Sequence, residues 1–234
     1  MSNKSSQLFS IGTKNESSLH RTLKFEYAGV GGKTEAAVGE YVTDGITASG
    51  EYIEVQTGSF APLAKKVKEL TAHGKVQIIH PIIVSKIIEV YDEKGGLLYR
   101  RKSPAHGTIW DLFDALLYAP QLPLTKGVVI ELAMVEVTEK RIKDGKGSWR
   151  RKGISILDKE LTAWHERFLF KSKTDYLCFI PFKKGEEFTV SSHAQKAGIK
   201  TETARKALYV LNKMGLIERI GKKGTAWVYR SSLR

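Results

Sequence analysis

Several features are scarce or missing in the 234-residue sequence, and each absence excludes a class of protein. The single cysteine, Cys178, cannot form an internal disulfide bond or a cysteine-based zinc site, which favours a reducing cytoplasm. The N-terminal residues MSNKSSQ lack the apolar core of a signal peptide. No apolar run approaches the roughly 20 residues of a membrane-spanning helix, and the six histidines show no metal-ligand spacing. We therefore predict a globular, cytoplasmic protein.

The composition is strongly basic. Lys and Arg number 38 against 25 Asp and Glu, which gives a formal net charge of +13. Such a surplus favours a polyanionic partner, because binding releases the counterions that surround the polyanion. A membrane surface would use the same charge, but no spanning segment supports a membrane protein, so nucleic acid is the expected partner. Hydrophobic residues make up 41% of the chain, enough for one large domain or two modest ones.

The N-terminal part of the chain predicts helices alternating with short strands. The expected elements are a helix over 15–28, strands over 34–38, 41–46 and 52–57, a helix over 62–71 and a strand over 75–84. The first helix is predicted from Leu19, Leu23 and Tyr27, which recur at intervals of four and form one apolar face. The predicted order is αβββαβ, and the predicted fold class is α/β (α+β).

The middle of the chain predicts further strands and one helix. A hairpin is expected over 87–100, and Thr108 and Asp111 have the spacing of a capping box at a helix start. A strand over 128–138 is followed by a basic loop over 139–152. The predicted organisation is a flexible leader over 1–14, a domain over 15–153, a helical connector over 154–181 and a basic domain over 182–234.

Residues 182–234 predict a small unit with twelve Lys and Arg against four acids. Its expected elements are a helix over 192–197, a longer helix over 201–214 and a hairpin over 216–230, with Trp227 packed into the core. This order resembles winged helix-turn-helix domains. The resemblance implies that the second helix enters the major groove of DNA and that the hairpin, or wing, approaches the flanking backbone. The expected contacts are Thr203, Arg205 and Lys206 from the helix and Lys222 and Lys223 from the wing.

Two further basic clusters are candidate nucleic-acid contacts. They consist of Arg100, Arg101 and Lys102 in one case and of Arg150, Arg151 and Lys152 in the other. The first cluster precedes the predicted helix start at Thr108, where free N–H groups can hold a phosphate. The second follows Trp149, whose ring can stack on a base. The alternative for each cluster is a solvated loop.

Three polar residues are predicted to converge in the N-terminal sheet. Asp44 ends one strand and Glu54 lies in the next, so antiparallel pairing brings them together at one edge. Gln56 comes two residues later and faces the same side as Glu54. Two neighbouring carboxylates repel each other unless a cation lies between them, and oxygen ligands of this kind suit Mg²⁺ or Mn²⁺. We therefore expect a metal site here.

With these residues the chain resembles the PD-(D/E)XK nuclease superfamily, whose restriction-endonuclease-like core has the order αβββαβ. That superfamily carries an acid on the first helix, an Asp on the second strand and Glu-x-Lys on the third. This sequence matches these motif positions in order and in element type, with Glu16, Asp44 and the run Glu54-Val55-Gln56. The resemblance therefore extends to both the order of elements and the candidate site.

The resemblance covers residues 15–90 and implies metal-dependent hydrolysis of a phosphodiester. It departs from the family at Gly45, where an apolar residue is usual, and at Gln56, where Lys is typical. Gln can hold a water molecule by hydrogen bonds but supplies no positive charge. The implied roles are metal binding by Asp44, Glu54 and the Val55 carbonyl, orientation of the attacking water by Gln56, and a contact from Glu16 to a metal-bound water or second ion.

We predict a metal-dependent endonuclease that cleaves DNA under the guidance of a C-terminal winged helix, as restriction, defence or repair enzymes do. The alternatives are a non-enzymatic DNA-binding regulator with an inactive nuclease-like domain, an RNA-binding or RNA-cleaving protein, and a winged helix that contacts only proteins. In a purely structural role, Asp44 caps a turn, Glu54 pairs with a lysine such as Lys24, and Glu16 complements a helix dipole. Duplex cleavage needs two active sites, which argues for a homodimer.

Overall fold

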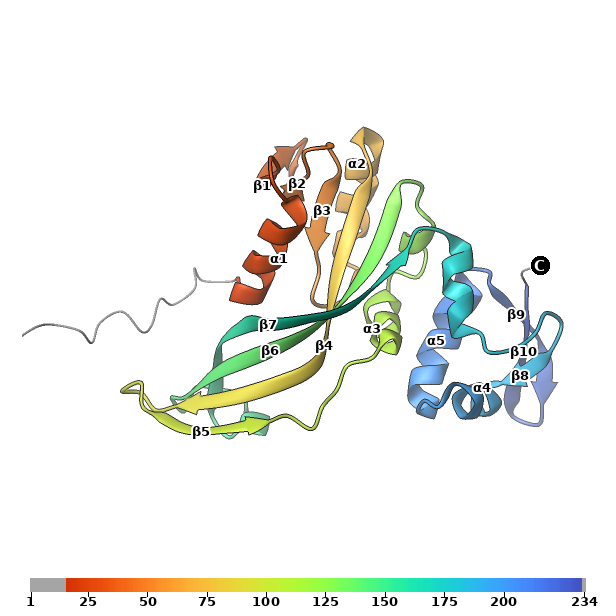
Figure 1. Cartoon of the computed structure of the whole chain (residues 1–234). Coiled ribbons are helices and arrows are strands. Elements are labelled where there is room, and N and C mark those ends of the chain that lie inside the picture. Colours follow the sequence, from red (N-terminus) through yellow and green to blue (C-terminus); the bar gives the residue numbers. More distant parts are fainter. Residues whose placement is uncertain (1–15, 233–234) are drawn as a thin grey trace, which may run out of the picture.

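A computed structural model gives the structure of residues 16–232, so the predicted leader over 1–14 lies outside the described residues. The helices are α1 Ser18–Ala28, α2 Leu63–His73, α3 Leu112–Leu116, α4 Val190–Ala197 and α5 Thr201–Lys213. The strands are β1 Lys33–Val38, β2 Tyr41–Ile46, β3 Tyr52–Val55, β4 Val76–Tyr91, β5 Leu97–Lys102, β6 Val128–Lys143, β7 Ile154–Phe170, β8 Glu187–Thr189, β9 Ile217–Lys223 and β10 Ala226–Ser231. The fold is mixed α and β, as predicted (Figure 1).

The predicted order of helix, three strands, helix and strand is present from α1 to β4. α1 begins after Ser17, whose side chain accepts a hydrogen bond from the His20 N–H, and it ends at Gly29, where φ is 68°. β1, β2 and β3 form an antiparallel meander. α2 then carries the chain back so that β4 runs parallel to β3.

One large sheet has the strand order β1-β2-β3-β4-β6-β7, and β5 pairs with the second half of β4. β4 and β6 each span 16 residues and continue past β3 as an arm, which points to the lower left in Figure 1. The predicted strand over 75–84 and the first strand of the predicted hairpin are therefore one strand. β6 likewise continues to Lys143, so the predicted loop over 139–152 is shorter than expected.

The predicted helical connector over 154–181 is wrong, because β7 occupies Ile154–Phe170. Leu157, Leu161 and Trp164 recur at intervals of four and three, which imitates a helix. The register between β6 and β7 shifts at three places, and each shift inserts a residue that breaks the alternation of side chains along the strand. The large sheet therefore extends past the predicted domain boundary at residue 153.

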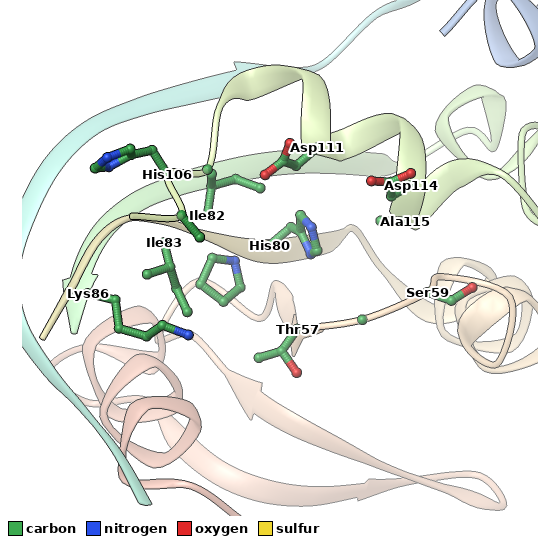
Figure 2. A pocket seen from close by; sticks show the side chains of 14 residues that line it. Thr57, Ser59, His80, Ile82, Ile83, Lys86, His106, Asp111, Asp114 and Ala115 are labelled. Carbon is green, nitrogen blue, oxygen red and sulfur yellow. The ribbon is translucent and has the colours of Figure 1, made fainter. Parts of the chain in front are cut away.

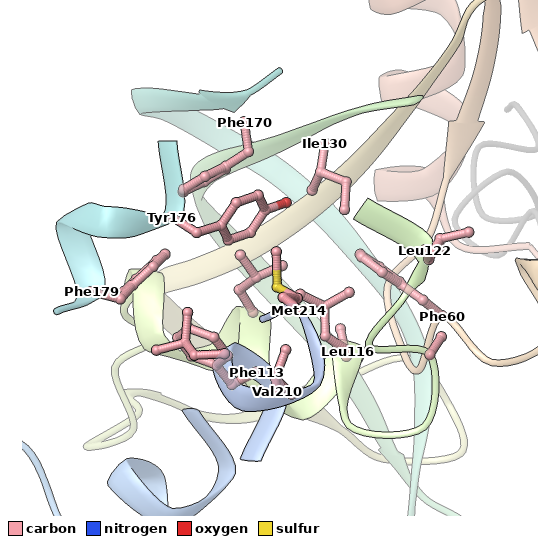
Figure 3. Packing of buried hydrophobic residues seen from close by; sticks show 14 of the residues in the cluster. Phe60, Phe113, Leu116, Leu122, Ile130, Phe170, Tyr176, Phe179, Val210 and Met214 are labelled. Carbon is pink, nitrogen blue, oxygen red and sulfur yellow. The ribbon is translucent and has the colours of Figure 1, made fainter. Parts of the chain in front are cut away.

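Side-chain alternation divides the core into clusters on the two faces of the large sheet. Ile78 and Ile79 are adjacent in β4, yet Ile78 packs in the cluster that contains α2 and α3, and Ile79 packs with α1. The first cluster continues into the C-terminal unit, because Val210 of α5 and Met214, which follows α5, lie beside Phe113 of α3 (Figure 3). The C-terminal unit therefore shares a hydrophobic core with the large sheet.

The C-terminal unit consists of α4, α5 and a three-stranded sheet with the order β8-β10-β9. Gly198 ends α4 in a left-handed conformation with φ of 66°, which allows the tight turn into α5. The predicted sequence of two helices and a hairpin is thus present. Within the described residues 16–232, none of the helices combines the length and the apolar character that a membrane span requires.

Phe113 is a direct probe of the shared core. It is fully buried, and the centroid of its ring lies 4.8 Å from that of Phe179. Phe113→Ala is expected to lower the free energy of unfolding by about 3–5 kcal/mol, because it removes apolar contacts and leaves a cavity. Urea titration measures this change. Tyr118→Ala, at a residue that is 76% exposed, serves as the control and is expected to cost less than about 0.5 kcal/mol.

Candidate functional site

Asp44 and Glu54 lie together where β2 and β3 stop pairing. Gly45 pairs with Ile53, and the continuation of this register sets Asp44 opposite Glu54. The Val55 N–H donates a hydrogen bond of 2.8 Å to Oδ2 of Asp44. The Asp44 side chain thereby takes the place of a backbone acceptor and holds its carboxylate beside Glu54.

α1 brings a row of charged side chains to this point. Glu16, His20 and Lys24 follow one another at intervals of four, so they share one face of the helix and the turn before it. The His20 ring lies between two carboxylates, with Nδ1 3.3 Å from Oε1 of Glu16 and Nε2 3.2 Å from Oδ2 of Asp44. Sequence reasoning missed His20 and named Lys24 only as a structural partner of Glu54, although the spacing of both from Glu16 places them beside it.

Lys24 joins Glu16 to a further acid on β1. Its ammonium lies 2.8 Å from Oε1 of Glu16 and 2.7 Å from Oε1 of Glu35, and the side chain is almost fully buried. Burial alone would lower the pKa of Lys24, but the contacts with the two carboxylates outweigh burial and raise it. Glu35 adopts a φ of 54°. Strained backbone conformations of this kind are more frequent at functional sites.

Glu54 is only 2% exposed, and its partner is Lys66 of α2 rather than Lys24. The Lys66 ammonium donates to Oε2 of Glu54 at 2.6 Å. Among residues 16–232, Oε1 of Glu54 has no hydrogen-bond partner. Burial raises the pKa of Glu54, the charge of Asp44 raises it further, and the contact with Lys66 offsets these effects only in part.

The pKa of Asp44 is shifted in the opposite direction from that of Glu54. Burial would raise its pKa, but the hydrogen bonds from His20 and from the Val55 N–H outweigh burial and lower it. We call Glu16, His20, Lys24, Asp44, Glu54 and Lys66 the charge cluster. Each of its carboxylates contacts a basic side chain. Between residues 16 and 232, no group of three or more His, Cys, Asp or Glu is arranged to hold a metal ion.

Gln56 is turned toward the loop that follows β3. Its side-chain amide donates to the Ser59 carbonyl at 2.7 Å, and its backbone carbonyl lies 2.5 Å from Nδ1 of His80. The predicted water-orienting group therefore has its N–H₂ engaged by the protein itself. Lys66, which sequence reasoning missed, is the cation beside the predicted metal ligands.

The predicted basic contacts lie in two separate parts of the molecule. Arg100, Arg101 and Lys102 are exposed on β5, and Arg150, Arg151 and Lys152 lie between β6 and β7. These two clusters belong to the arm at the lower left of Figure 1, whereas α5 and β9 lie at the right. Several of the groups have internal partners: Arg100 pairs with Glu89, and Nε of Arg151 donates to the Ile154 carbonyl.

α5 is less accessible than predicted. Lys206 is one of the expected DNA contacts, but its ammonium lies 2.7 Å from Asp114 of α3 and 3.0 Å from Glu202. Asn212 donates to the Ile217 carbonyl and is also occupied. Thr203 is half-buried, and Arg205 remains exposed. The packing of α3 on α5 explains the loss of Lys206, because it places Asp114 beside that ammonium.

The hairpin of β9 and β10 is the more exposed basic surface. Lys222 and Lys223 are exposed, as predicted. The expectation that Trp227 packs into the core is wrong, because its side chain is 41% exposed. Lys222 and Arg219 lie 4.6 Å and 4.9 Å from the centre of the Trp227 ring. Trp227 pairs with Lys222, and the register shift between Val228 and Tyr229 brings Arg219 to the same face, so the aromatic ring lies between two cations.

These observations define a mixed α and β protein with buried, compensated carboxylates at the end of a strand pair. The chain belongs to the family described as Domain of unknown function (DUF8091), which matches residues 17–171. A protein of Treponema pallidum (strain Nichols), described as an uncharacterized protein, is 25% identical over 221 residues, covering 94% of this chain and 87% of that protein. No solved structure matches the chain significantly.

The buried pair of Glu54 and Lys66 yields a test of the site's electrostatics. Lys66→Met leaves the Glu54 carboxylate without its cation and is expected to lower the free energy of unfolding by about 3 kcal/mol near pH 7.5. Because the pKa of Glu54 is raised in the folded state, the folded protein binds this proton more tightly than the unfolded chain does. The cost is therefore expected to grow as the pH rises through that pKa and to be smaller near pH 5.

Urea titrations at the two pH values measure this difference. The double variant Glu54→Gln with Lys66→Met replaces both charges by neutral groups of similar size and is expected to recover part of the stability. A cost that is the same at both pH values would show that Lys66 acts only through packing.

Proposed function

We propose that this protein is a cytoplasmic, metal-dependent endonuclease similar to the PD-(D/E)XK superfamily and that it acts on DNA. The main support is the meeting of Asp44 and Glu54 from adjacent strands with Glu16, which reaches them through His20. The element order from α1 to β4 agrees with the order expected of that superfamily. The net charge of +13 favours a polyanionic substrate.

The donors present suit Mg²⁺ or Mn²⁺. Asp44, Glu54 and the Val55 carbonyl would hold the ion, which would activate a water molecule and neutralise charge on the phosphodiester. Oε1 of Glu54 supports the fit of these donors to a metal ion, because it is a buried hard oxygen with no hydrogen-bond partner among residues 16–232. Because the pKa of Glu54 is raised, protons would compete with the ion at higher pH than at an ordinary carboxylate.

The basic members of the charge cluster have separate roles in this proposal. Lys66 supplies the positive charge that Gln56 lacks, because its ammonium already lies beside the carboxylate of Glu54. It would stabilise negative charge on a phosphate. Glu16 acts as a positioning residue, since it contacts both His20 and Lys24 and so orients the groups next to Asp44.

In the C-terminal unit we propose a winged helix that contacts nucleic acid mainly through its wing. Lys222, Lys223, Arg219 and Trp227 are available there, whereas Lys206 of α5 is held by two carboxylates. Exposed cations with an interleaved aromatic ring suit both phosphate contacts and stacking on a base. Arg205 and Thr203 would add contacts from α5.

A second candidate function is a non-enzymatic DNA-binding protein. The specific observation in its favour is that each carboxylate of the charge cluster contacts a basic side chain. Carboxylates compensated in this way stabilise a fold without an ion. The two candidates differ in one measurable property, which is cleavage that depends on a divalent cation.

Plasmid and linear DNA incubated with Mg²⁺ or Mn²⁺ are expected to be cut, and EDTA is expected to stop the reaction. Asp44→Asn and Glu54→Gln each remove a ligand charge and are expected to lower the rate at least about 100-fold. Glu69→Gln makes the same chemical change at an exposed position of α2 and is the matched control. Equal rates in all three variants, or no metal-dependent cleavage by the unaltered protein, would leave the DNA-binding alternative.

DNA binding is tested through its salt dependence. Lys222→Ala combined with Lys223→Ala is expected to reduce the slope of log K against log salt concentration by about 2, because each lysine contacts about one phosphate. Lys206→Ala is the control, since its ammonium is occupied by Asp114 and Glu202, and we expect a smaller change. Fluorescence anisotropy with a labelled duplex measures both. A larger effect from Lys206→Ala would mean that α5 dominates the contact.

A further inference from the structure

A cavity of about 430 Å³ lies between the segment after β3, the middle of β4 and the start of α3 (Figure 2). Thr57 and Ser59 line it from the segment after β3, His80 lines it from β4, and Asp111 and Asp114 line it from the α3 side. None of these five residues belongs to the charge cluster. The cavity is therefore a separate feature that the proposed cleavage reaction does not use.

His80 presents a fixed hydrogen-bond acceptor to this cavity. It is 5% exposed, and its Nδ1 lies 2.5 Å from the Gln56 carbonyl, so Nδ1 must carry the proton that it donates. Burial lowers the pKa of His80 and keeps the ring neutral, which leaves a lone pair on Nε2. Phe60 packs edge-on against the ring with centroids 5.2 Å apart, and Nε2 has no hydrogen-bond partner among residues 16–232.

Asp111 and Asp114 make the opposite wall of the cavity rich in acceptors. Asp111 belongs to a capping box, in which the Thr108 N–H points to its Oδ2 at 3.4 Å. Burial and the neighbouring charge of Asp114 raise the pKa of Asp111, so a ligand that donates hydrogen bonds would relieve the repulsion. Lys206 neutralises Asp114 from the rim, at 2.7 Å. Lys86 also lines the cavity, but its ammonium lies 3.2 Å from Oε2 of Glu139. The acceptors of Asp111 and His80 therefore favour a ligand group that carries N–H donors.

The cavity and the charge cluster are neighbours along the chain. Thr57 follows Glu54 by three residues, which span at most about 11 Å even when fully extended. A ligand with an anionic backbone and a planar group can therefore contact both. The volume lies within the range of about 300–1,000 Å³ that is usual for small-molecule sites and suits a single nucleoside.

We propose that this cavity binds one nucleobase that presents N–H donors, with guanine as the preferred base, displaced from the stack of its strand. Guanine carries a ring N–H next to an exocyclic amine, and this pair can donate two parallel hydrogen bonds to the Asp111 carboxylate. Nε2 of His80 accepts a further N–H. Thymine has carbonyl groups on both sides of its one ring N–H, and these face repulsion from Asp111. The proposal rests on the proposed action on nucleic acid and adds base selection to it.

Isothermal titration of the full chain with dGMP, dAMP, dCMP and dTMP, without divalent cations, tests the proposal. We expect dGMP to bind at least tenfold more tightly than dTMP. Asp111→Asn replaces an acceptor by an amide, and His80→Phe keeps an aromatic ring but removes the acceptor; each is expected to weaken dGMP binding at least fivefold. His165→Phe makes the same change at an exposed histidine of β7 and is expected to leave the affinity unchanged. Circular dichroism melting curves establish that the variants are folded.

The outcomes separate this inference from the proposed cleavage. A loss of dGMP affinity in Asp44→Asn as large as the loss in Asp111→Asn would assign the base to the charge cluster and overturn the cavity proposal. Equal affinity for all four nucleotides, no binding at millimolar concentration, or tighter binding of methylguanidinium would also overturn it. If the protein binds guanine selectively but never cuts DNA, the proposed nuclease activity is refuted and the assignment of the base to the cavity is retained.

Discussion

The hydrogen bond from the Val55 N–H to the Asp44 carboxylate is the constraint from which the candidate site follows. β2 and β3 pair regularly only at Gly45 with Ile53 and at Ile46 with Tyr52, and the next N–H of β3 binds a side chain instead of a carbonyl. The strands can therefore separate at this point without leaving a buried N–H unsatisfied. The gap admits charged side chains from α1 and α2, which flank opposite faces of the sheet.

Charge compensation then determines which groups occupy that gap. Buried carboxylates are stable only with partners, and Lys24, His20 and Lys66 provide them at distances between 2.6 and 3.3 Å. The two carboxyls at the centre nevertheless differ, since hydrogen bonds lower the pKa of Asp44 and burial raises that of Glu54. In the proposed function, a divalent ion at these two carboxyls would compete with protons and with Lys66. The same compensation also stabilises the fold when no ion is bound.

The C-terminal unit is coupled to this region through α3. Its helix α5 packs on α3 and pairs with it through Lys206 and Asp114, and Asp114 also lines the cavity next to β3. A partner that contacts the C-terminal unit therefore acts on an element that borders the cavity. The exposed β9–β10 hairpin and the basic arm around β5 lie at opposite ends of the molecule (Figure 1), so a nucleic acid that contacted both would have to span the large sheet.

Local sequence patterns were enough to predict the order of elements from α1 to β4, the two helices and hairpin of the C-terminal unit, and the proximity of Asp44 and Glu54. These features follow from short-range periodicity and from the pairing of consecutive strands, which local patterns encode. Tertiary structure decided the rest. The register shifts between β6 and β7 break the side-chain alternation that would have identified β7 as a strand. Asp114 of α3 pairs with Lys206 of α5, and Lys66 rather than Lys24 pairs with Glu54. Each outcome depends on contacts between residues distant in sequence, and no periodicity within a single segment carries that information.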